Sequence, residues 1–464
     1  MAAHAYGDDT PITAFATAPG GSALTLIRCS GKDALNFAAR IFSSPKKILE
    51  AAGNTVIHGW ITETREKERI DEVLVSVFRA PKSYTGEDSL DISCHGGAAA
   101  GKAVMSALLA AGFREALPGE FTFRAFINGK IDLTRSESVM ELVSAKTECA
   151  RRNAVSRLSG ALEHEINDIK KILVELLGAS EILLDYSEDE ISAGADEISG
   201  RLPGKELALK ALARLTRLAE SWQREKIYQE GALAVIAGRP NAGKSSLFNL
   251  LVMEERSIVT PAPGTTRDWI EAWVSIAGIP VRLADTAGLR NTSDPVEKIG
   301  VERSRDLLEA ADLVLYLIDG TEGLTNEDTA FIAEIQENAP PKPLLLLWNK
   351  ADISPSNTKE AFLDISAKTG LGMAELTAAI RNAIIGKTED SEPIASVGTE
   401  RQKTHVDTAV AALEEALRLA DGDEPLDIIA PLLREAVNAL GTITGEVSTD
   451  DILEEMFSKF CVGK

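Results

Sequence analysis

The sequence predicts a multidomain protein in which an α/β domain is inserted into a helical domain, with an α+β domain in front of both. Three observations lead to this prediction. Residues 231–386 alternate short apolar runs with helical stretches, which is typical of a parallel sheet covered on both faces. Residues 129–230 and 387–464 carry helical periodicity, whereas residues 1–128 mix strand-like and helix-like segments. A chain of 464 residues has room for about two to four domains.

The first domain, residues 1–128, is predicted to be α+β. Leu24–Arg28, Glu72–Phe78 and Leu90–Cys94 are rich in apolar and β-branched residues, as strands are. Lys102–Ala111 has the composition of a helix.

The helical domain is predicted from a heptad-like apolar stripe, followed by an acidic, glycine-containing loop at 187–204. The stripe is short, which favours an intramolecular helix bundle over a free coiled coil. The helical pattern returns at 404–420 and 426–439, after the polar linker 387–398. The stripe is formed by Leu158, Leu162, Ile166, Ile169, Leu173 and Leu176.

A phosphate-binding loop opens the inserted domain. Residues 238–245 read GRPNAGKS, between the apolar run 232–237 and a helix-like stretch that begins at Ser246. In such a loop the backbone N–H groups surround phosphates, the lysine reaches the β- and γ-phosphates and the serine hydroxyl binds Mg²⁺. With both flanks in place, the motif predicts a nucleoside triphosphate site.

Three later motifs indicate a guanine nucleotide and a Ras-like fold. Asp285 ends a predicted strand as a partner for Mg²⁺, and Gly288 follows it, where its N–H can meet the γ-phosphate. Residues 349–352 read NKAD after another buried run, and the Asp352 carboxylate can accept two hydrogen bonds from adjacent guanine N–H groups. Residues 366–368 supply a second loop beside the base. The predicted GTP-binding residues are Asn241, Ala242, Gly243, Lys244, Ser245, Ser246, Thr260, Thr265, Thr266, Asp285, Thr286, Ala287, Gly288, Asn349, Lys350, Asp352, Ser366, Ala367 and Lys368.

The composition and patterning of the chain argue against several classes of protein. The net charge of −22 argues against nonspecific coating of nucleic acid, which depends on many lysines and arginines. The four cysteines have no CxxC spacing, so neither a disulfide framework nor a zinc site is indicated. There is no signal-peptide pattern and no apolar run long enough to span a membrane. We therefore expect a soluble, cytoplasmic protein.

Hydrolysis of GTP would need an unusual arrangement here. Ras-like GTPases carry a water-orienting glutamine where this chain has Leu289. Asn241 and the oxygen-rich loop 260–268 can instead form a cage for a monovalent cation, with Thr266 as a second Mg²⁺ ligand beside Ser245. Glu297, twelve residues after Asp285, can position the attacking water. The plainer alternative for Glu297 is an exposed carboxylate, and the residues alone favour that alternative.

These motifs together resemble those of a known family. GRPNAGKSS, GTTRD, DTAGLR with VEKIG, and NKAD are similar to the potassium-activated, translation-factor-like GTPases. The terminal FCVGK at 460–464, with residues 440–446, 118–122 and 83–88, narrows the resemblance to the tRNA-modification GTPases of the MnmE (TrmE) family. The resemblance covers the whole chain.

The resemblance implies a homodimer joined by N-terminal domains that bind 5-formyl- or methylene-tetrahydrofolate. With the flavoprotein MnmG, such a protein adds an aminomethyl or carboxymethylaminomethyl group to C5 of the wobble uridine of certain tRNAs. It implies GTP, Mg²⁺ and K⁺ as cofactors, and Glu297 as the catalytic residue. It also implies Mg²⁺ ligands at Ser245 and Thr266, K⁺ ligands at Asn241, Thr260, Ala262 (backbone) and Thr265, and folate contacts at Arg28, Glu87, Lys130 and Lys464.

The implied folate contacts suit their ligand chemically. The Glu87 carboxylate can pair with adjacent N–H donors of a pterin, and Arg28 and Lys130 can bind an anionic tail. Each also has a plainer alternative, such as a turn cap or a solvated charge. Cys461, within FCVGK, has the plainer alternative of a small buried hydrophobe.

Two other functions are compatible with the GTP motifs. A ribosome-assembly or translation-associated GTPase shares the asparagine-bearing loop, but it would need an RNA-binding appendage, whereas the flanks here are acidic and helical. A non-enzymatic guanine-nucleotide scaffold is the second rival, and comparing hydrolysis in K⁺ and in Na⁺ would separate it from the enzyme.

Overall fold

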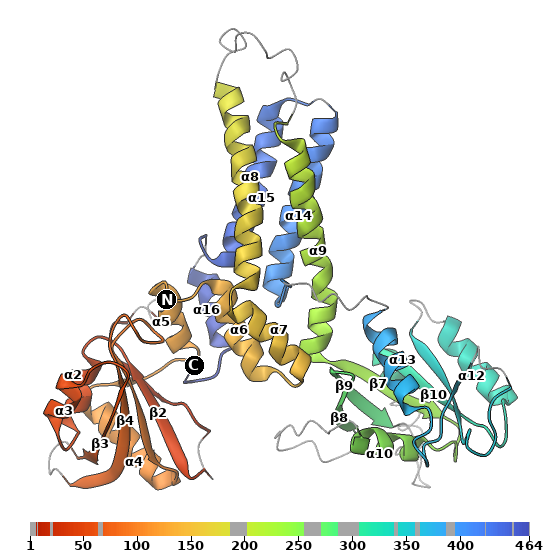
Figure 1. Cartoon of the computed structure of the whole chain (residues 1–464), viewed down its shortest axis with the longest axis horizontal. Coiled ribbons are helices and arrows are strands. Elements are labelled where there is room, and N and C mark those ends of the chain that lie inside the picture. Colours follow the sequence, from red (N-terminus) through yellow and green to blue (C-terminus); the bar gives the residue numbers. More distant parts are fainter. Residues whose placement is uncertain are drawn as a thin grey trace. The chain divides into compact units, whose positions relative to one another are not determined.

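The structure of the chain is a computed structural model with side chains (Figure 1). It describes residues 6, 8–18, 22–63, 68–185, 202–254, 271–285, 306–337, 342–357, 362–386, 395–422, 424–447 and 450–463. The chain divides into two compact units, which we describe separately. Unit 1 consists of Met1–Met140, Ile166–Pro203 and Arg418–Lys464, and unit 2 consists of Glu141–Glu165 and Gly204–Leu417. The predicted four-domain division follows other boundaries and stays a prediction.

The N-terminal part of unit 1 is an α+β domain built on a six-stranded sheet of order β3-β4-β5-β2-β1-β6, antiparallel except for the β1–β6 pair. The predicted strands all lie within the observed ones, and the predicted helix 102–111 begins earlier, at Ala98. One face of the sheet packs on helices to form the core. The elements are β1 Ile12–Phe15, β2 Leu24–Ser30, α2 Ala34–Arg40, α3 Pro45–Glu50, β3 Thr55–Thr62, β4 Arg69–Phe78, β5 Ser89–His95, α4 Ala98–Ala111 and β6 Arg114–Glu115.

In unit 1, a helix near the C-terminus contacts a helix of the N-terminal part of the chain. Helix α5 (Glu120–Ile127) follows β6 and contacts α16 (Asp450–Ser458), which lies near the C-terminus. An apolar cluster of Leu133, Leu453, Phe457 and Phe460 fills this contact. Helix α15 (Leu426–Thr444) precedes α16 and buries one face, which includes Ile429, Leu433 and Leu440.

The predicted leucine stripe is interrupted by a helix break. Helix α7 (Glu148–Leu158) ends at Leu158, and α8 (Ala161–Asp185) begins after Gly160, which has a φ of 96°. The stripe is therefore divided between two helices, with Leu158 in α7 and the other five residues in α8. Leu162 to Leu176 are buried as predicted, but Leu158 is only half-buried, because it belongs to the preceding helix.

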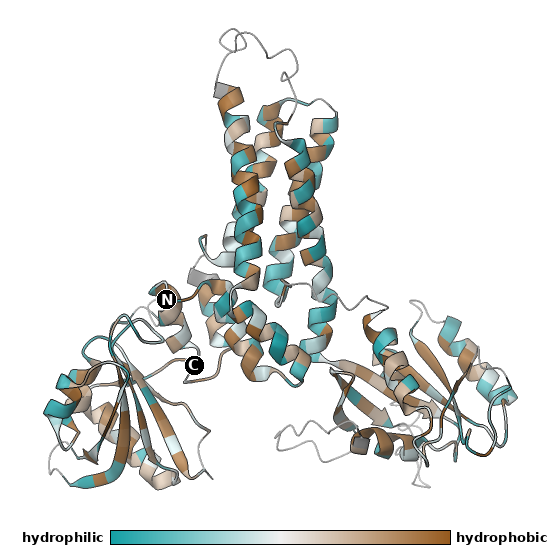
Figure 2. Ribbon diagram, in the orientation of Figure 1, coloured by the Kyte–Doolittle hydropathy of each residue, from teal (hydrophilic) through white to brown (hydrophobic). Residues whose placement is uncertain are grey.

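Unit 2 contains the predicted α/β domain. Its sheet has the order β12-β11-β10-β7-β9-β8, and every neighbouring pair is parallel except the β8–β9 hairpin. Separate apolar clusters lie on its two faces, which explains the continuous hydrophobic runs in the strands (Figure 2). The elements are β7 Ala232–Gly238, α10 Lys244–Glu254, β8 Glu271–Ile276, β9 Ile279–Asp285, β10 Leu313–Asp319, α12 Asn326–Glu337, β11 Leu344–Asn349, β12 Leu363–Asp364 and α13 Met373–Ile385.

Helix α9 (Lys205–Glu230) leads into the α/β domain, and α14 (Glu400–Asp421) follows it. The segment that returns from the domain is held near the end of α9 by two hydrogen bonds. The Val397 N–H donates to Ser221 Oγ at 3.0 Å, and the Gln229 side chain donates to the Gly398 carbonyl at 2.8 Å. Among the described residues, no helix combines the length and apolarity that crossing a membrane requires.

Candidate functional site

The loop after β7 has the geometry of a phosphate cradle. Gly238 has a φ of 141°, and a Cβ atom there would lie 2.4 Å from the Leu317 carbonyl oxygen. The Lys244 ammonium donates to the carbonyls of Gly238 and Arg239, at 2.9 and 2.8 Å. Lys244 is thus buried with its charge inside the loop. Asn241 is exposed at the tip in a left-handed conformation, with a φ of 63°.

The predicted Mg²⁺ partners lie together at the edge of this loop. The Ser245 hydroxyl, at the start of α10, donates to Asp285 Oδ2 over 2.9 Å, and Asp285 is the buried last residue of β9. A hydroxyl and a carboxylate are hard oxygen ligands of the kind that Mg²⁺ binds. The residues present therefore fit the ion, and Ser246 is exposed beside them.

The base-side motifs meet the phosphate loop through Asn349. This residue is buried, its Nδ2 donates to the Ala242 carbonyl at 2.7 Å, and its Oδ1 accepts from the Ala367 N–H at 2.9 Å. Sequence reasoning gave Asn349 only a contact with the base. The structure gives it a second role, as a bridge that holds two nucleotide-binding loops together.

The other base-side residues differ in exposure, and their contacts with the base stay predictions. Asp352 and Lys368 are exposed, whereas Ser366 is buried and accepts from the Thr369 N–H at 3.2 Å through its hydroxyl. The Lys350 ammonium pairs with Asp319 at the end of β10. Burial would raise the pKa of Asp319, but hydrogen bonds from Lys350 and Thr321 lower it, so this carboxylate stays charged and holds Lys350 in place.

Several predicted residues lie outside the described part of the chain. They include the K⁺ ligands other than Asn241, the second Mg²⁺ ligand and the catalytic glutamate. These residues are Thr260, Ala262, Thr265, Thr266, Thr286, Ala287, Gly288, Glu297 and Lys464.

A second polar site lies in unit 1, around the loop between β4 and β5. Arg28 in β2 pairs with Asp91 through its Nε at 3.1 Å. Its guanidinium carbon lies 5.9 Å from the ring centres of Tyr84 and of Phe121, so two aromatic rings flank the charge. Burial raises the pKa of Tyr84, which keeps the phenol protonated.

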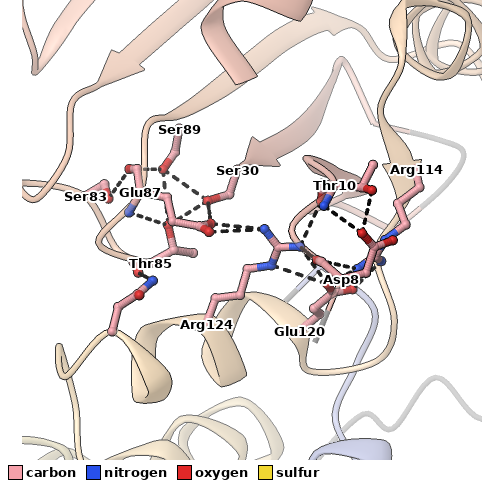
Figure 3. A network of polar contacts seen from close by, with 11 residues as sticks. Asp8, Thr10, Ser30, Ser83, Thr85, Glu87, Ser89, Arg114, Glu120 and Arg124 are labelled. Carbon is pink, nitrogen blue, oxygen red and sulfur yellow. Dashed lines mark hydrogen bonds and ion pairs between the residues drawn. The ribbon is translucent and has the colours of Figure 1, made fainter. Parts of the chain in front are cut away.

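Glu87 and Lys130 approach the same loop (Figure 3). Glu87 accepts from the Ser30 hydroxyl at 2.8 Å and from Arg124 at 3.2 Å. The Lys130 ammonium donates to the Pro81 carbonyl at 2.8 Å. The structure therefore places Arg28, Glu87 and Lys130 around one loop, although together they span about 100 positions of sequence. Their role in folate binding stays a prediction.

Two protein-family models match separate ranges of the sequence. The N-terminus of the GTP-binding protein TrmE matches residues 11–130, and the MnmE helical domain matches residues 133–461, which is more than half of the chain. This chain belongs to the MnmE family.

Full-length relatives agree with this assignment. The tRNA modification GTPase MnmE of Treponema denticola is 43% identical over 478 residues, covering 99% of both chains. The tRNA modification GTPase MnmE of Acetivibrio thermocellus is 39% identical over 469 residues, covering 99% of this chain and all of the relative. A solved structure of Era with MgGDPNP and part of 16S ribosomal RNA covers 39% of this chain and 66% of that one, at 26% identity and a TM-score of 0.28. As a member of the MnmE family, the protein is a GTP hydrolase.

The C-terminal motif of this MnmE-family protein contacts the N-terminal domain of the same chain. The Cys461 carbonyl accepts from the Gly119 N–H at 3.4 Å, and Gly463 is buried against the backbone of Phe15 in β1. Cys461 itself is exposed, so the plainer alternative of a small buried hydrophobe does not apply at this position.

Sequence reasoning missed Arg124, Tyr84 and Phe121 as parts of the unit 1 site. Two of them stand in segments that carry the family resemblance, at 83–88 and 118–122. Arg124 lies one helical turn after Glu120, and this spacing of opposite charges is a signal for an ion pair on one face of a helix. That signal does not reveal the contact with Glu87, which comes from another segment.

Proposed function

We propose that this MnmE-family protein, together with the flavoprotein MnmG, adds an aminomethyl or carboxymethylaminomethyl group to C5 of the wobble uridine of certain tRNAs. The observation that carries the proposal is the polar site around Glu87, in a domain that the C-terminal FCVG segment contacts at Gly119, in a chain that also carries a phosphate-binding loop. A GTPase that acted only on ribosomes would have no use for this second site.

We propose that the second site binds 5-formyl- or methylene-tetrahydrofolate, which when bound supplies the one-carbon unit. Arg28 and Lys130 attract the anionic tail, and Glu87 accepts hydrogen bonds from the pterin N–H groups. Lys464, which follows the buried Gly463 in sequence, is the fourth folate contact of this proposal. In a chain with a net charge of −22, such local positive charges are needed to attract an anion.

GTP hydrolysis in this proposal depends on K⁺. Lys244 neutralises phosphate charge, and the Ser245–Asp285 pair, with Thr266, holds Mg²⁺. Asn241, Thr260, the Ala262 carbonyl and Thr265 hold K⁺ where other GTPases receive an arginine finger. Glu297 orients the attacking water, because Leu289 stands where Ras-like proteins carry glutamine.

We further propose a homodimer joined through the N-terminal domains, working on tRNA in the cytoplasm. Apolar side chains that are exposed on the sheet support this association. Val56 in β3 is 63% exposed and Leu74 in β4 is 50% exposed, on strands that pair with each other. Burying such a face against a second copy would remove apolar surface from water.

Nucleoside analysis of tRNA from cells that lack this protein tests the proposal. We expect the C5-modified wobble uridine to be absent, to return with the wild-type gene, and to stay absent with Glu87→Ala or Lys244→Ala. The rival ribosome-assembly function predicts unchanged tRNA nucleosides and accumulated ribosomal precursors. That result would contradict the proposal.

A further inference from the structure

We propose that Arg124 is a positioning residue that orients the Glu87 carboxylate toward the pterin ring of a reduced folate. This inference rests on the proposed folate function and deepens it, because it names the group that sets the direction of the recognising carboxylate. Arg124 lies in α5, which precedes Lys130 in the chain, and its side chain points toward the β4–β5 loop (Figure 3).

The Arg124 guanidinium is fixed from its far side. Its NH2 group donates to the backbone carbonyls of Asp8 and Thr10, at 3.1 and 2.9 Å, and to Glu120 at 2.9 Å. Its Nε also donates to Glu120, at 3.3 Å. The side chain is 7% exposed, and its planar fork has little freedom to rotate. The remaining nitrogen, NH1, is thereby aimed in one direction.

That direction is Glu87. Arg124 NH1 lies 3.2 Å from one carboxylate oxygen and 3.3 Å from the other, and Ser30 donates to the second oxygen at 2.8 Å. These contacts fix the carboxylate plane, yet they use only part of the roughly four hydrogen bonds that a carboxylate can accept. The Glu87 side chain is 23% exposed, so accepting capacity remains for a ligand.

The loop does not need the Glu87 carboxylate to hold its own shape. Its backbone is fixed by other groups, because the Ser83 hydroxyl donates to the Glu87 carbonyl at 2.5 Å and Asn128 donates to the Thr85 carbonyl at 2.7 Å. The Glu87–Arg124 contact is therefore additional to the bonds that shape the loop. The contact helps to neutralise the buried Arg124 charge, and it also fixes the direction of the Glu87 carboxylate.

Arg114 provides a matched comparison. It also pairs with the buried Glu120, at 2.5 Å, but no contact joins it to Glu87 in the described structure. Replacing either arginine removes a partner of Glu120, and only the replacement of Arg124 also releases Glu87. The two variants thus separate the stability of the α5 region from the orientation of Glu87.

The test is a double-mutant cycle in the full chain, with 5-formyl-tetrahydrofolate binding measured by calorimetry. We expect Arg124→Gln to weaken binding about tenfold in the protein with Glu87 and to have less than about a twofold effect in the Glu87→Gln background. Arg114→Gln should lower the unfolding temperature without changing the folate affinity. If Arg124→Gln does not fold, Arg124→Lys keeps the charge, loses the planar fork, and should show the same coupling at a smaller size.

Two results would overturn the inference in different ways. An Arg124→Gln effect of equal size in both backgrounds would mean that Arg124 does not act through Glu87, and it would leave the proposed function intact. A wild-type protein that binds no reduced folate would remove the proposed function and this inference together.

Discussion

Replacing Asn349 with alanine should weaken guanine nucleotide binding far more than the loss of one contact with the base. The side chain joins the phosphate loop to the second base-side loop through hydrogen bonds of 2.7 and 2.9 Å. Alanine would leave the Ala242 carbonyl and the Ala367 N–H without these partners, and both residues are more than nine-tenths buried.

The size of the effect follows from these two groups. Each buried polar group that loses its partner costs about 1–3 kcal/mol, so the pair costs about 2–6 kcal/mol. The lower limit corresponds to about a thirtyfold weaker affinity if the bound state needs both loops in place. Part of the cost also appears without nucleotide, as a lower unfolding temperature, because the bridge joins groups of the folded domain itself.

Titration with a fluorescent GDP analogue measures the affinity, and thermal unfolding with and without nucleotide measures the stability. Asn249→Ala is the matched control, since Asn249 is an exposed asparagine on α10 of the same domain. We expect this control to leave both quantities unchanged. A nucleotide affinity of Asn349→Ala within about threefold of the wild type would refute the bridging argument.

Four further predictions concern the proposed chemistry. GTP turnover should need K⁺, and Asn241→Ala should remove most of the K⁺ advantage but not GTP binding; equal wild-type rates in Na⁺ and K⁺ would contradict this. Asp352→Asn should shift preference from GTP to xanthine nucleotides, checked by competitive titration. Glu297→Ala should lower GTP turnover by about tenfold or more, and Asp294→Ala should lower it much less. If Asp294→Ala has the larger effect, Asp294 is the catalytic carboxylate instead. Deleting Phe460–Lys464 should abolish tRNA modification and leave K⁺-stimulated hydrolysis nearly intact, and loss of both would show that the sites are not independent.

The GTP site was largely predictable because its motifs are local. A strand, a glycine-rich turn and a helix start are encoded within a few residues of Lys244, and parallel strands bring their carboxyl ends to the same edge. The Asn349 bridge was not predictable, because its partners Ala242 and Ala367 are 107 and 18 residues away in sequence. Only the fold determines that these backbone groups face one amide.

The unit 1 site also depends on contacts between distant segments, which the sequence does not reveal. The resemblance supplied Arg28, Glu87 and Lys130 as contacts of one ligand, but it did not say which elements bring them together. One such element is α5, whose Phe121 lies beside Arg28 and whose Arg124 contacts Glu87. Helical periodicity does not predict these contacts, because Phe121 and Arg124 contact residues from two different segments of the chain. The helix break at Gly160 was missed for a simpler reason, since apolar spacing continues across it.

The FCVGK motif can now be explained in physical terms. Gly463 has a φ of 95°, and a Cβ atom there would lie 2.4 Å from the Phe15 carbonyl oxygen, so only glycine fits both the conformation and the close approach. Phe15 pairs with Ile27, the residue before Arg28. Gly119, with a φ of 69°, likewise allows the close approach of the Phe457 carbonyl to the start of α5. Two glycines thus let the end of the chain, up to Gly463, lie against β1, which pairs with the strand of Arg28, and against α5, whose Phe121 lies beside Arg28.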